Sequence, residues 1–148
     1  ILDGRDCCFG WWIFLVNELA ITNSKPIPGD KLILVGFGNG RASTTKYDAY
    51  VSNDDDCVYL SGNKNVKIGK DITKNTFFIG CDTVQGDSGS AVINRVTGEL
   101  IGLYFGMANP DMKNPLTSEE IYQNLGTDFL EFETNSSWAI DIRTIPLN

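Results

Sequence analysis

The sequence contains no histidine, and this absence limits the chemistry of the chain more than any other feature. Imidazole is the side chain that titrates between pH 5 and 8, and it is the commonest metal ligand in proteins. A mechanism that needs an imidazole base therefore requires a second segment or chain. The four cysteines also lack the paired spacing of zinc sites, so we expect neither a metal nor an organic cofactor.

The chain is also poor in positive charge and in long apolar runs. Its 12 lysines and arginines are outnumbered by 19 acidic residues, and the net charge of −7 argues against a nucleic-acid partner. The longest apolar run, residues 7–16, is about half of the roughly 20 residues that a membrane-spanning helix needs. We therefore expect no nucleic acid and no membrane among the partners.

The remaining composition is typical of one folded domain. The chain has 148 residues, of which 42% are hydrophobic and 21% charged, enough for a single core. It begins with Ile1 and has no basic stretch before an apolar one, which suggests a processed or truncated segment. Adjacent Cys7 and Cys8 do not easily bond to each other, so Cys57 and Cys81 form the expected disulfide. This pair and the glycosylation sequon at Asn135 favour a secreted protein.

Hydrophobic periodicity predicts mostly short strands. The stretches rich in β-branched and aromatic residues are 11–16, 31–35, 49–51, 58–60, 75–79, 91–94, 100–105 and 137–142. Turn residues separate them at 26–30, 52–56, 61–63 and 97–98. Many short strands indicate a β-barrel or a β-sandwich. The exception is residues 117–130, where a capping box beginning at Thr117 predicts a short helix or a structured loop.

The segment that carries chemistry is residues 86–90, Gly-Asp-Ser-Gly-Ser, between apolar stretches at 77–79 and 91–93. A serine between glycines on a tight turn, as Ser88 is, exposes its Oγ, and small neighbours let a substrate carbonyl approach the backbone. The amides of Gly86 and Ser88 can then point at one position and stabilise an oxyanion. The pattern indicates an acyl-transfer site, although a simple glycine-rich β-turn has the same composition.

Around this motif the sequence resembles the chymotrypsin-like (trypsin-like) serine proteases, from the catalytic aspartate of that fold to its C-terminus. Residues 81–90 resemble the nucleophile segment, and residues 98–106 resemble the following strand, which lines the substrate cleft. Residues 35–39 resemble the glycine-aromatic-glycine turn of the second barrel, and residues 138–142 its closing strand. The resemblance implies an all-β fold, with an antiparallel six-stranded β-barrel and one or two strands of the first barrel.

The resemblance also implies roles for individual residues. Ser88 matches the nucleophile, Gly86 and Ser88 the oxyanion hole, and Asp87 the buried aspartate that pairs in this family with a new N-terminal amine. Asp82 falls where trypsin-like members place the acid that binds Arg or Lys; its alternative role is a surface carboxylate beside a disulfide. Val84 replaces a family cysteine, so one pocket disulfide is missing. The implied substrate-binding residues are Asp82, Gln85, Tyr104, Phe105 and Gly106.

Asp6 resembles the aspartate that orients the catalytic histidine, and a capping or surface role is its alternative. In the family that histidine precedes the aspartate, so the resemblance places the missing imidazole upstream of Ile1. We therefore predict a serine endopeptidase that forms an acyl-enzyme on Ser88, with its histidine on a separate N-terminal chain or segment. Residues 1–24 would end the first barrel and connect the two, and residues 25–148 would form the C-terminal barrel.

The expected partners are the histidine-bearing chain, a polypeptide substrate and a protein inhibitor. Two other hypotheses stay open. A protease-like domain that has lost its base would act as a binding or adaptor module, although the retained Gly86, Asp87 and Ser88 argue against it. A chymotrypsin-like protease of the intracellular viral or bacterial type would keep all four cysteines as free thiols.

Overall fold

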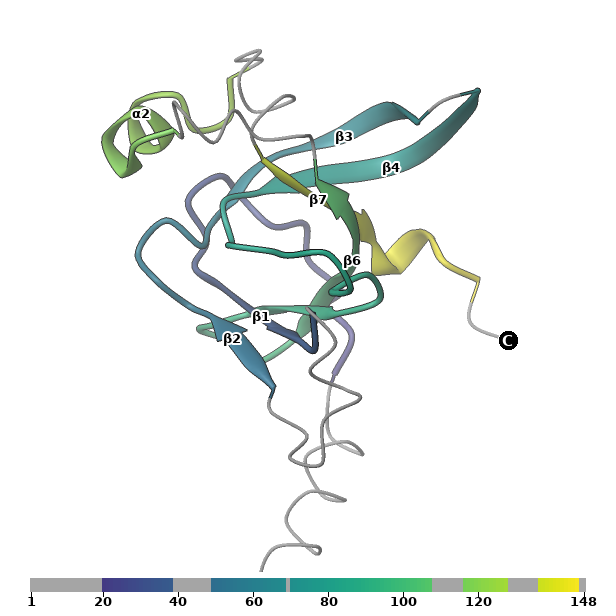
Figure 1. Cartoon of the computed structure of the whole chain (residues 1–148), viewed down its shortest axis with the longest axis horizontal. Coiled ribbons are helices and arrows are strands. Elements are labelled where there is room, and N and C mark those ends of the chain that lie inside the picture. Colours follow the sequence, from purple (N-terminus) through teal and green to yellow (C-terminus); the bar gives the residue numbers. More distant parts are fainter. Residues whose placement is uncertain (1–19, 39–48, 69, 108–115, 128–135, 147–148) are drawn as a thin grey trace, which may run out of the picture.

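The chain folds into a β-structure with one short α-helix, as seen in a computed structural model that describes residues 20–38, 49–68, 70–107, 116–127 and 136–146 (Figure 1). The strands are β1 (Leu32–Gly36), β2 (Tyr50–Ser52), β3 (Tyr59–Ile68), β4 (Asp71–Ile79), β5 (Ala91–Asn94), β6 (Leu100–Met107) and β7 (Ser137–Asp141). The helices are α2 (Ser118–Gln123) and the short 3-10 helix η2 (Ile142–Thr144). All pairs of neighbouring strands are antiparallel.

The sheet closes into a barrel. Its strand order is β2-β1-β5-β6-β7-β4-β3, and the two ends meet where Lys31 bridges Val58. There the amide of Leu32 donates to the carbonyl of Cys57 at 2.8 Å, and the amide of Tyr59 donates to the carbonyl of Asp30 at 2.9 Å. Because β2 and β3 both lie beside β1, they act as two halves of one strand interrupted by residues 53–57. The closed ring therefore has six strands, which confirms the predicted antiparallel barrel.

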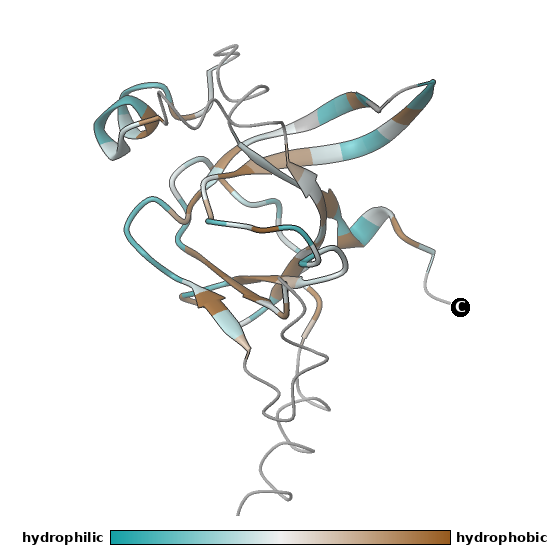
Figure 2. Ribbon diagram, in the orientation of Figure 1, coloured by the Kyte–Doolittle hydropathy of each residue, from teal (hydrophilic) through white to brown (hydrophobic). Residues whose placement is uncertain are grey.

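The barrel interior is filled by side chains that alternate along the strands. In β1, Leu32 and Leu34 are fully buried, while the residues between them are half-buried, as expected for a strand with one face on the core. Burying each such side chain stabilises the fold by about 1.5–3 kcal/mol. Figure 2 shows the apolar residues concentrated on the strands that form the ring. The interior cluster consists of Leu32, Leu34, Cys57, Tyr59, Phe77, Ile79, Cys81, Val92, Ile101, Tyr104 and Ala139.

Helix α2 covers a second apolar cluster outside the barrel. Ile121 packs there with four buried residues of β3, β4 and the loop before β3, namely Val58, Leu60, Val66 and Phe78. The helix begins with the predicted capping box, in which the hydroxyl of Thr117 accepts the amide of Glu120 at 3.3 Å. The amide of Thr117 donates in return to the Glu120 carboxylate at 2.9 Å, which lowers the pKa of Glu120. The predicted short helix is confirmed.

The prediction of a turn at residues 61–63 was wrong, because these residues lie inside β3. The strand continues through several register shifts against β4. Gly62 has no turn role here: a Cβ at this position would lie 1.8 Å from the Tyr59 hydroxyl, so only glycine admits that close approach. Burial raises the pKa of this Tyr59 hydroxyl to about 12.

The segment that leads into the barrel runs beside β6. Ile21 forms a parallel bridge with Leu100, and the amide of Thr22 donates to the Leu100 carbonyl at 3.0 Å. The predicted strand at 11–16 lies outside the described residues, so the division into 1–24 and 25–148 stays a prediction. Within the part of the chain that the structure describes, no helix is long and apolar enough to cross a membrane.

Candidate active site

Ser88 lies at the surface, on the loop between β4 and β5. The loop contains two glycines in the left-handed region, Gly86 with φ of 98° and Gly89 with φ of 92°, a conformation that side chains rarely permit. Ser88 stands between them and is exposed. Among the described residues, its Oγ donates a single long hydrogen bond, 3.5 Å, to the carbonyl of Phe105. The hydroxyl is therefore accessible to a molecule that approaches from solvent.

The loop is fastened to β6 by a pair of backbone hydrogen bonds. The amide of Gly89 donates to the carbonyl of Tyr104 at 2.8 Å, and the amide of Tyr104 donates to the carbonyl of Ser90 at 2.9 Å. Ser88 therefore lies directly beside the strand that contains three of the predicted substrate-binding residues.

Asp87 anchors the loop from within. Its side chain is only 1% exposed, and its two oxygens accept the amide of Gly38 at 2.6 Å and the amide of Val84 at 2.9 Å. Its backbone amide donates to the Val84 carbonyl at 3.1 Å, and its carbonyl accepts the amide of Ser90 at 2.9 Å. Among the described residues, no Lys or Arg forms an ion pair with this carboxylate. The predicted pairing of Asp87 with an N-terminal amine stays a prediction.

The close approach of Asp87 explains the glycine-aromatic-glycine turn after β1. A Cβ on Gly36 would lie 2.3 Å from the Asp87 carboxylate oxygen Oδ1. A Cβ on Gly38 would lie 2.6 Å from the same oxygen and 2.4 Å from a methyl group of Val84. Any side chain at either position would therefore displace the carboxylate that holds the loop of Ser88.

The predicted oxyanion-hole donors are available for a ligand. No hydrogen bond among the described residues uses the amide of Gly86 or the amide of Ser88. Both amides belong to the loop that Asp87 anchors. Their predicted role as an oxyanion hole, in which two amides point at one position, stays a prediction.

The predicted substrate-binding residues of β6 differ in their surroundings. The Tyr104 side chain is 3% exposed and belongs to the barrel core, and burial raises the pKa of its hydroxyl. Phe105 is half-buried against Trp138, with ring centroids 6.1 Å apart. Gly106 follows in the same strand, and Gln85 is exposed on the loop of Ser88. Tyr104 is therefore a core residue, and the predicted substrate-binding role of Phe105, Gly106 and Gln85 stays a prediction.

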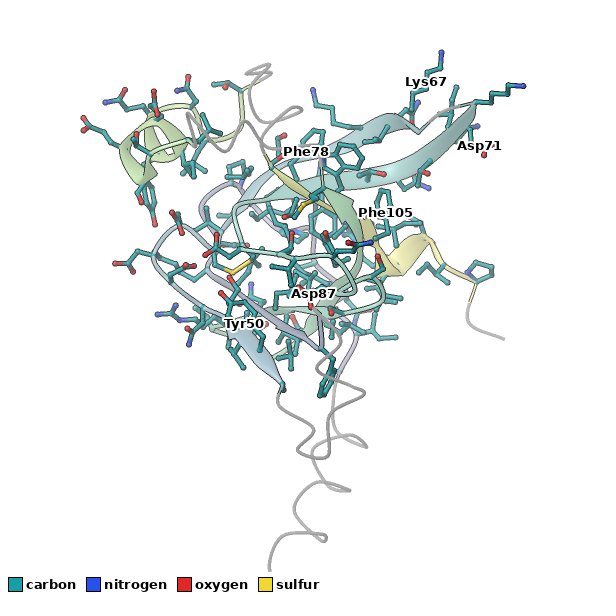
Figure 3. All side chains as sticks on the ribbon, in the orientation of Figure 1. Tyr50, Lys67, Asp71, Phe78, Asp87 and Phe105 are labelled. Atoms are coloured by element: carbon teal, nitrogen blue, oxygen red, sulfur yellow. A yellow bond between two sulfur atoms is a disulfide. The ribbon has the colours of Figure 1, made fainter. Side chains whose placement is uncertain are left out.

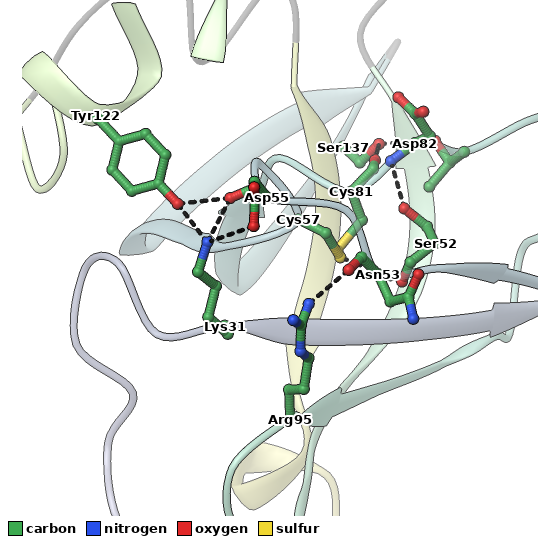
Figure 4. The surroundings of a disulfide bond; sticks show 11 residues. Lys31, Ser52, Asn53, Asp55, Cys57, Cys81, Asp82, Arg95, Tyr122 and Ser137 are labelled. Carbon is green, nitrogen blue, oxygen red and sulfur yellow. Dashed lines mark hydrogen bonds and ion pairs between the residues drawn. A yellow bond between two sulfur atoms is a disulfide. The ribbon is translucent and has the colours of Figure 1, made fainter. Parts of the chain in front are cut away.

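Asp82 is exposed, and only its backbone is fixed. Its amide donates to the hydroxyl of Ser52 in β2 at 2.9 Å (Figure 4). Its carboxylate lies near Asp54: partial burial raises the pKa of Asp54, and the carboxylates of Asp56 and Asp82 raise it further. The predicted contact of Asp82 with substrate cations is not tested by this position and stays a prediction.

A disulfide joins Cys57 to Cys81, as the sequence predicted, across 24 residues. Both cysteines are buried, and Cys81 begins the segment that leads to Ser88. The carbonyl of Cys81 also accepts a hydrogen bond from the Ser137 hydroxyl at 3.2 Å, and the hydroxyls of Ser137 and Thr83 lie 2.7 Å apart. Sequence reasoning missed these hydroxyl contacts, because they join residues 54 or more positions apart and no local pattern marks them.

The loop before Cys57 is held by helix α2. Lys31 donates to the carbonyl of Asp55 at 2.7 Å and to the Tyr122 hydroxyl at 2.5 Å, and that hydroxyl donates to the same carbonyl (Figure 4). Ser118 also donates to the Asp56 carboxylate at 3.1 Å. The helix therefore fixes the loop beside the disulfide.

Asp6, Cys7, Cys8 and Asn135 lie outside the described residues. The structure therefore brings together Ser88, Gly86, Asp87, Gln85 and the β6 residues, and it says nothing of the distance from Asp6 to Ser88. Within the described ranges, no three His, Cys, Asp or Glu side chains form a group that could hold a metal ion.

The chain is similar to known proteins in its sequence and in its structure. The sequence model of the family named Trypsin matches residues 15–124. No curated protein matches the chain as a relative. Among solved structures, the chain is similar to the crystal structure of Rv3671c from M. tuberculosis, the inactive form of a serine-to-alanine mutant, at 17% identity and a TM-score of 0.46. The match covers 88% of this chain and 56% of that chain, so the chain spans little more than half of that length.

Proposed function

Because the chain belongs to the trypsin family of serine proteases, we propose that it is the C-terminal part of a serine endopeptidase whose general base comes from another segment or chain. The observation that carries this proposal is the exposed Ser88 beside two available amides, on a loop that buried Asp87 fixes. A loop used only as a turn has no need of a buried carboxylate, because burying a charge destabilises a fold unless it is compensated.

In the proposed reaction Ser88 Oγ attacks the carbonyl carbon of the scissile peptide bond, and its proton passes to the imidazole of the partner. The amides of Gly86 and Ser88 then hydrogen-bond the oxyanion, and each such donor contributes about 10²–10³-fold in rate. Collapse of the intermediate breaks the C–N bond, and the imidazole gives the proton to the leaving amine. Water, deprotonated by the same imidazole, then hydrolyses the acyl-enzyme.

Asp6 has a positioning role in this proposal. An aspartate that accepts a hydrogen bond from the imidazole Nδ1–H fixes the tautomer whose Nε2 accepts the serine proton. The proposal therefore requires the partner's imidazole to lie between Asp6 and Ser88.

The test is labelling with a fluorophosphonate probe in the purified native assembly. We expect Ser88 to be labelled, because only an activated hydroxyl reacts, and Ser88→Ala to abolish labelling. Ser90→Ala is the matched control, a serine of the same loop two residues away, and it should keep the label. No labelling of Ser88, with the histidine-bearing partner confirmed in the sample, would overturn the proposal and favour a binding module.

The proposed preference for Arg or Lys before the scissile bond rests on Asp82. Because its carboxylate is exposed, an ion pair with the substrate is worth about 0.2–1 kcal/mol, a preference of about 1.4- to 5-fold. Asp82→Ser should remove that preference in kcat/KM for paired Arg and Gln substrates. An unchanged preference in this variant would refute the role of Asp82.

We also propose that the protein works in an oxidising compartment, as a secreted protein would. The buried Cys57–Cys81 disulfide supports this, because structural disulfides persist mainly outside reducing cytosol. Because both cysteines are buried, the freshly isolated protein has to be unfolded in denaturant, without reductant, before alkylation. Cys57 and Cys81 should then stay unmodified, and modification of both would contradict the proposal.

A further inference from the structure

The outer part of the β3–β4 hairpin projects beyond the barrel (Figure 1). Strand β7 pairs with β4 only from Thr76 to Ile79. The barrel closes at Val58, just before β3, and the backbone hydrogen bonds from other segments to β3 involve Tyr59 and Leu60. From Lys64 to Lys74, therefore, the described strands pair only with each other. At about 3.3 Å of rise per residue, this two-stranded ribbon extends about 15 Å past the barrel.

The ribbon concentrates positive charge in an acidic chain. A third of the chain's 12 basic residues lie within residues 64–74, where Asp71 is the one acidic residue. The hairpin from Tyr59 to Ile79 thus has a net charge of +3, while the whole chain has −7, so the rest has −10. Charges on the ribbon tip lie farther from the barrel than the Debye length of about 8 Å at physiological salt. The negative charge of the barrel therefore reduces the positive potential at the ribbon tip only weakly.

One face of the ribbon combines this charge with an apolar residue. Lys67 lies directly opposite Ile72, and Lys74, two residues further along β4, shares their face. Ile72 is 61% exposed, and Lys67, Lys70 and Lys74 are exposed. Figure 3 shows the Lys67 side chain pointing away from the barrel. None of these three lysines has an ion-pair partner among the described residues.

We propose that the basic end of this ribbon, formed by the face with Lys67, Ile72 and Lys74 and by Lys70 in the turn, binds an extended acidic segment of a partner protein. The ribbon has an open strand edge, to which an extended segment can add as a further strand. Carboxylates of that segment pair with the lysines, and an apolar side chain between them covers Ile72.

The surroundings favour a polypeptide over a nucleic acid. Sites for single-stranded nucleic acids combine positive charge with stacking on exposed aromatic rings, and the hairpin lacks the second feature because its aromatic residues, Tyr59, Phe77 and Phe78, are all buried. Lysines on a strand edge also prevent edge-to-edge pairing between molecules, a role that requires no partner. Binding of an acidic peptide distinguishes the two roles.

The test uses fluorescence anisotropy of a labelled peptide that alternates glutamate with valine, titrated with the full chain. Removing one exposed ion pair weakens binding by about 1.4- to 5-fold, so Lys67→Gln/Lys74→Gln should weaken it by about 2- to 25-fold. Two variants are compared with the control Val96→Glu: the double variant, which lowers the net charge by two, and Lys67→Gln alone, which lowers it by one, as the control does. Val96 is 85% exposed on the β5–β6 turn, away from the ribbon. Val96→Glu should bind the peptide like the parent chain.

Three results would overturn the proposal: no binding of the peptide, equal binding by the double variant, or tighter binding of heparin or single-stranded DNA than of the peptide at the same ionic strength. Circular dichroism confirms that the variants are folded. Because Ser88 labelling does not involve these lysines, failure here leaves the proposed protease function intact, and the two proposals are tested separately.

Discussion

The glycine-aromatic-glycine turn after β1 allows a direct test of whether Asp87 holds the loop of Ser88 in place. The perturbation is Gly38→Ala, which adds one methyl group 2.4 Å from a methyl of Val84 and 2.6 Å from Asp87 Oδ1. Both separations are far below van der Waals contact, so the Asp87 carboxylate or the turn has to move. Either movement lengthens the 2.6 Å hydrogen bond from the Gly38 amide to a buried carboxylate.

The expected cost follows from two effects. Overpacking a well-packed site costs about 1–3 kcal/mol. Weakening a hydrogen bond to a buried charged group adds to this cost, because such bonds contribute about 1.5–3 kcal/mol. A total of about 2–4 kcal/mol lowers the melting temperature by about 4–16 °C for a domain of this size.

The assay is thermal and urea unfolding followed by circular dichroism, together with the rate of Ser88 labelling in the native assembly. Gly106→Ala is the matched control for stability, because its Cβ would meet Trp138 at 3.6 Å, an ordinary contact. We expect this control to unfold within about 0.5 kcal/mol of the parent chain. If Gly38→Ala is as stable as Gly106→Ala and still labels at the parent rate, Asp87 does not position the loop through this turn.

Two further predictions concern stability. Replacing Cys57 and Cys81 by serine should destabilise the fold by about 3 kcal/mol in urea unfolding, from the loop of 24 residues that the disulfide closes, and an unchanged midpoint would refute this. Burial raises the pKa of Asp141, but hydrogen bonds from Arg143 outweigh that effect and lower it. Asp141 therefore contributes to the free energy of unfolding above the unfolded pKa of about 3.9. This contribution is lost as the pH falls through the lower pKa of Asp141 in the folded chain. Arg143→Gln should be less stable than the parent chain at neutral pH by about 1–2 kcal/mol, and the difference should shrink below about pH 4. A difference that stays constant with pH would contradict the assigned pair.

The sequence predicted the barrel well where hydrophobic alternation is strong. Residues 91–94 form β5 as predicted, and residues 31–35 lie within one position of β1. The distal β3–β4 hairpin was missed, because its lysines, asparagines and glycine are typical of loops. These residues form strands because β3 and β4 pair with each other, although their local propensity favours a loop. Such dependence on context is common for β-structure.

In the candidate site, too, the sequence predicted features that depend on neighbouring residues and missed contacts between distant ones. The loop around Ser88 was recognisable because glycine requirements at positions 86 and 89 are local and specific. The contact of Asp87 with Gly38 joins residues 49 positions apart, and the sequence analysis did not predict it. Exposure of Asp82 and burial of Tyr104 depend on how β6 and residues 53–57 pack, which no short pattern records.

The most direct test of the central claim is the pH dependence of Ser88 labelling, measured on the native assembly and on the isolated chain. Because this chain has no histidine, an imidazole dependence has to come from the partner. We expect the labelling rate in the assembly to rise with pH through an apparent pKa near 6.5, and the isolated chain to label far more slowly with no inflection there. Equal labelling of the isolated chain, or an assembly whose labelling rate shows no such inflection, would contradict the account.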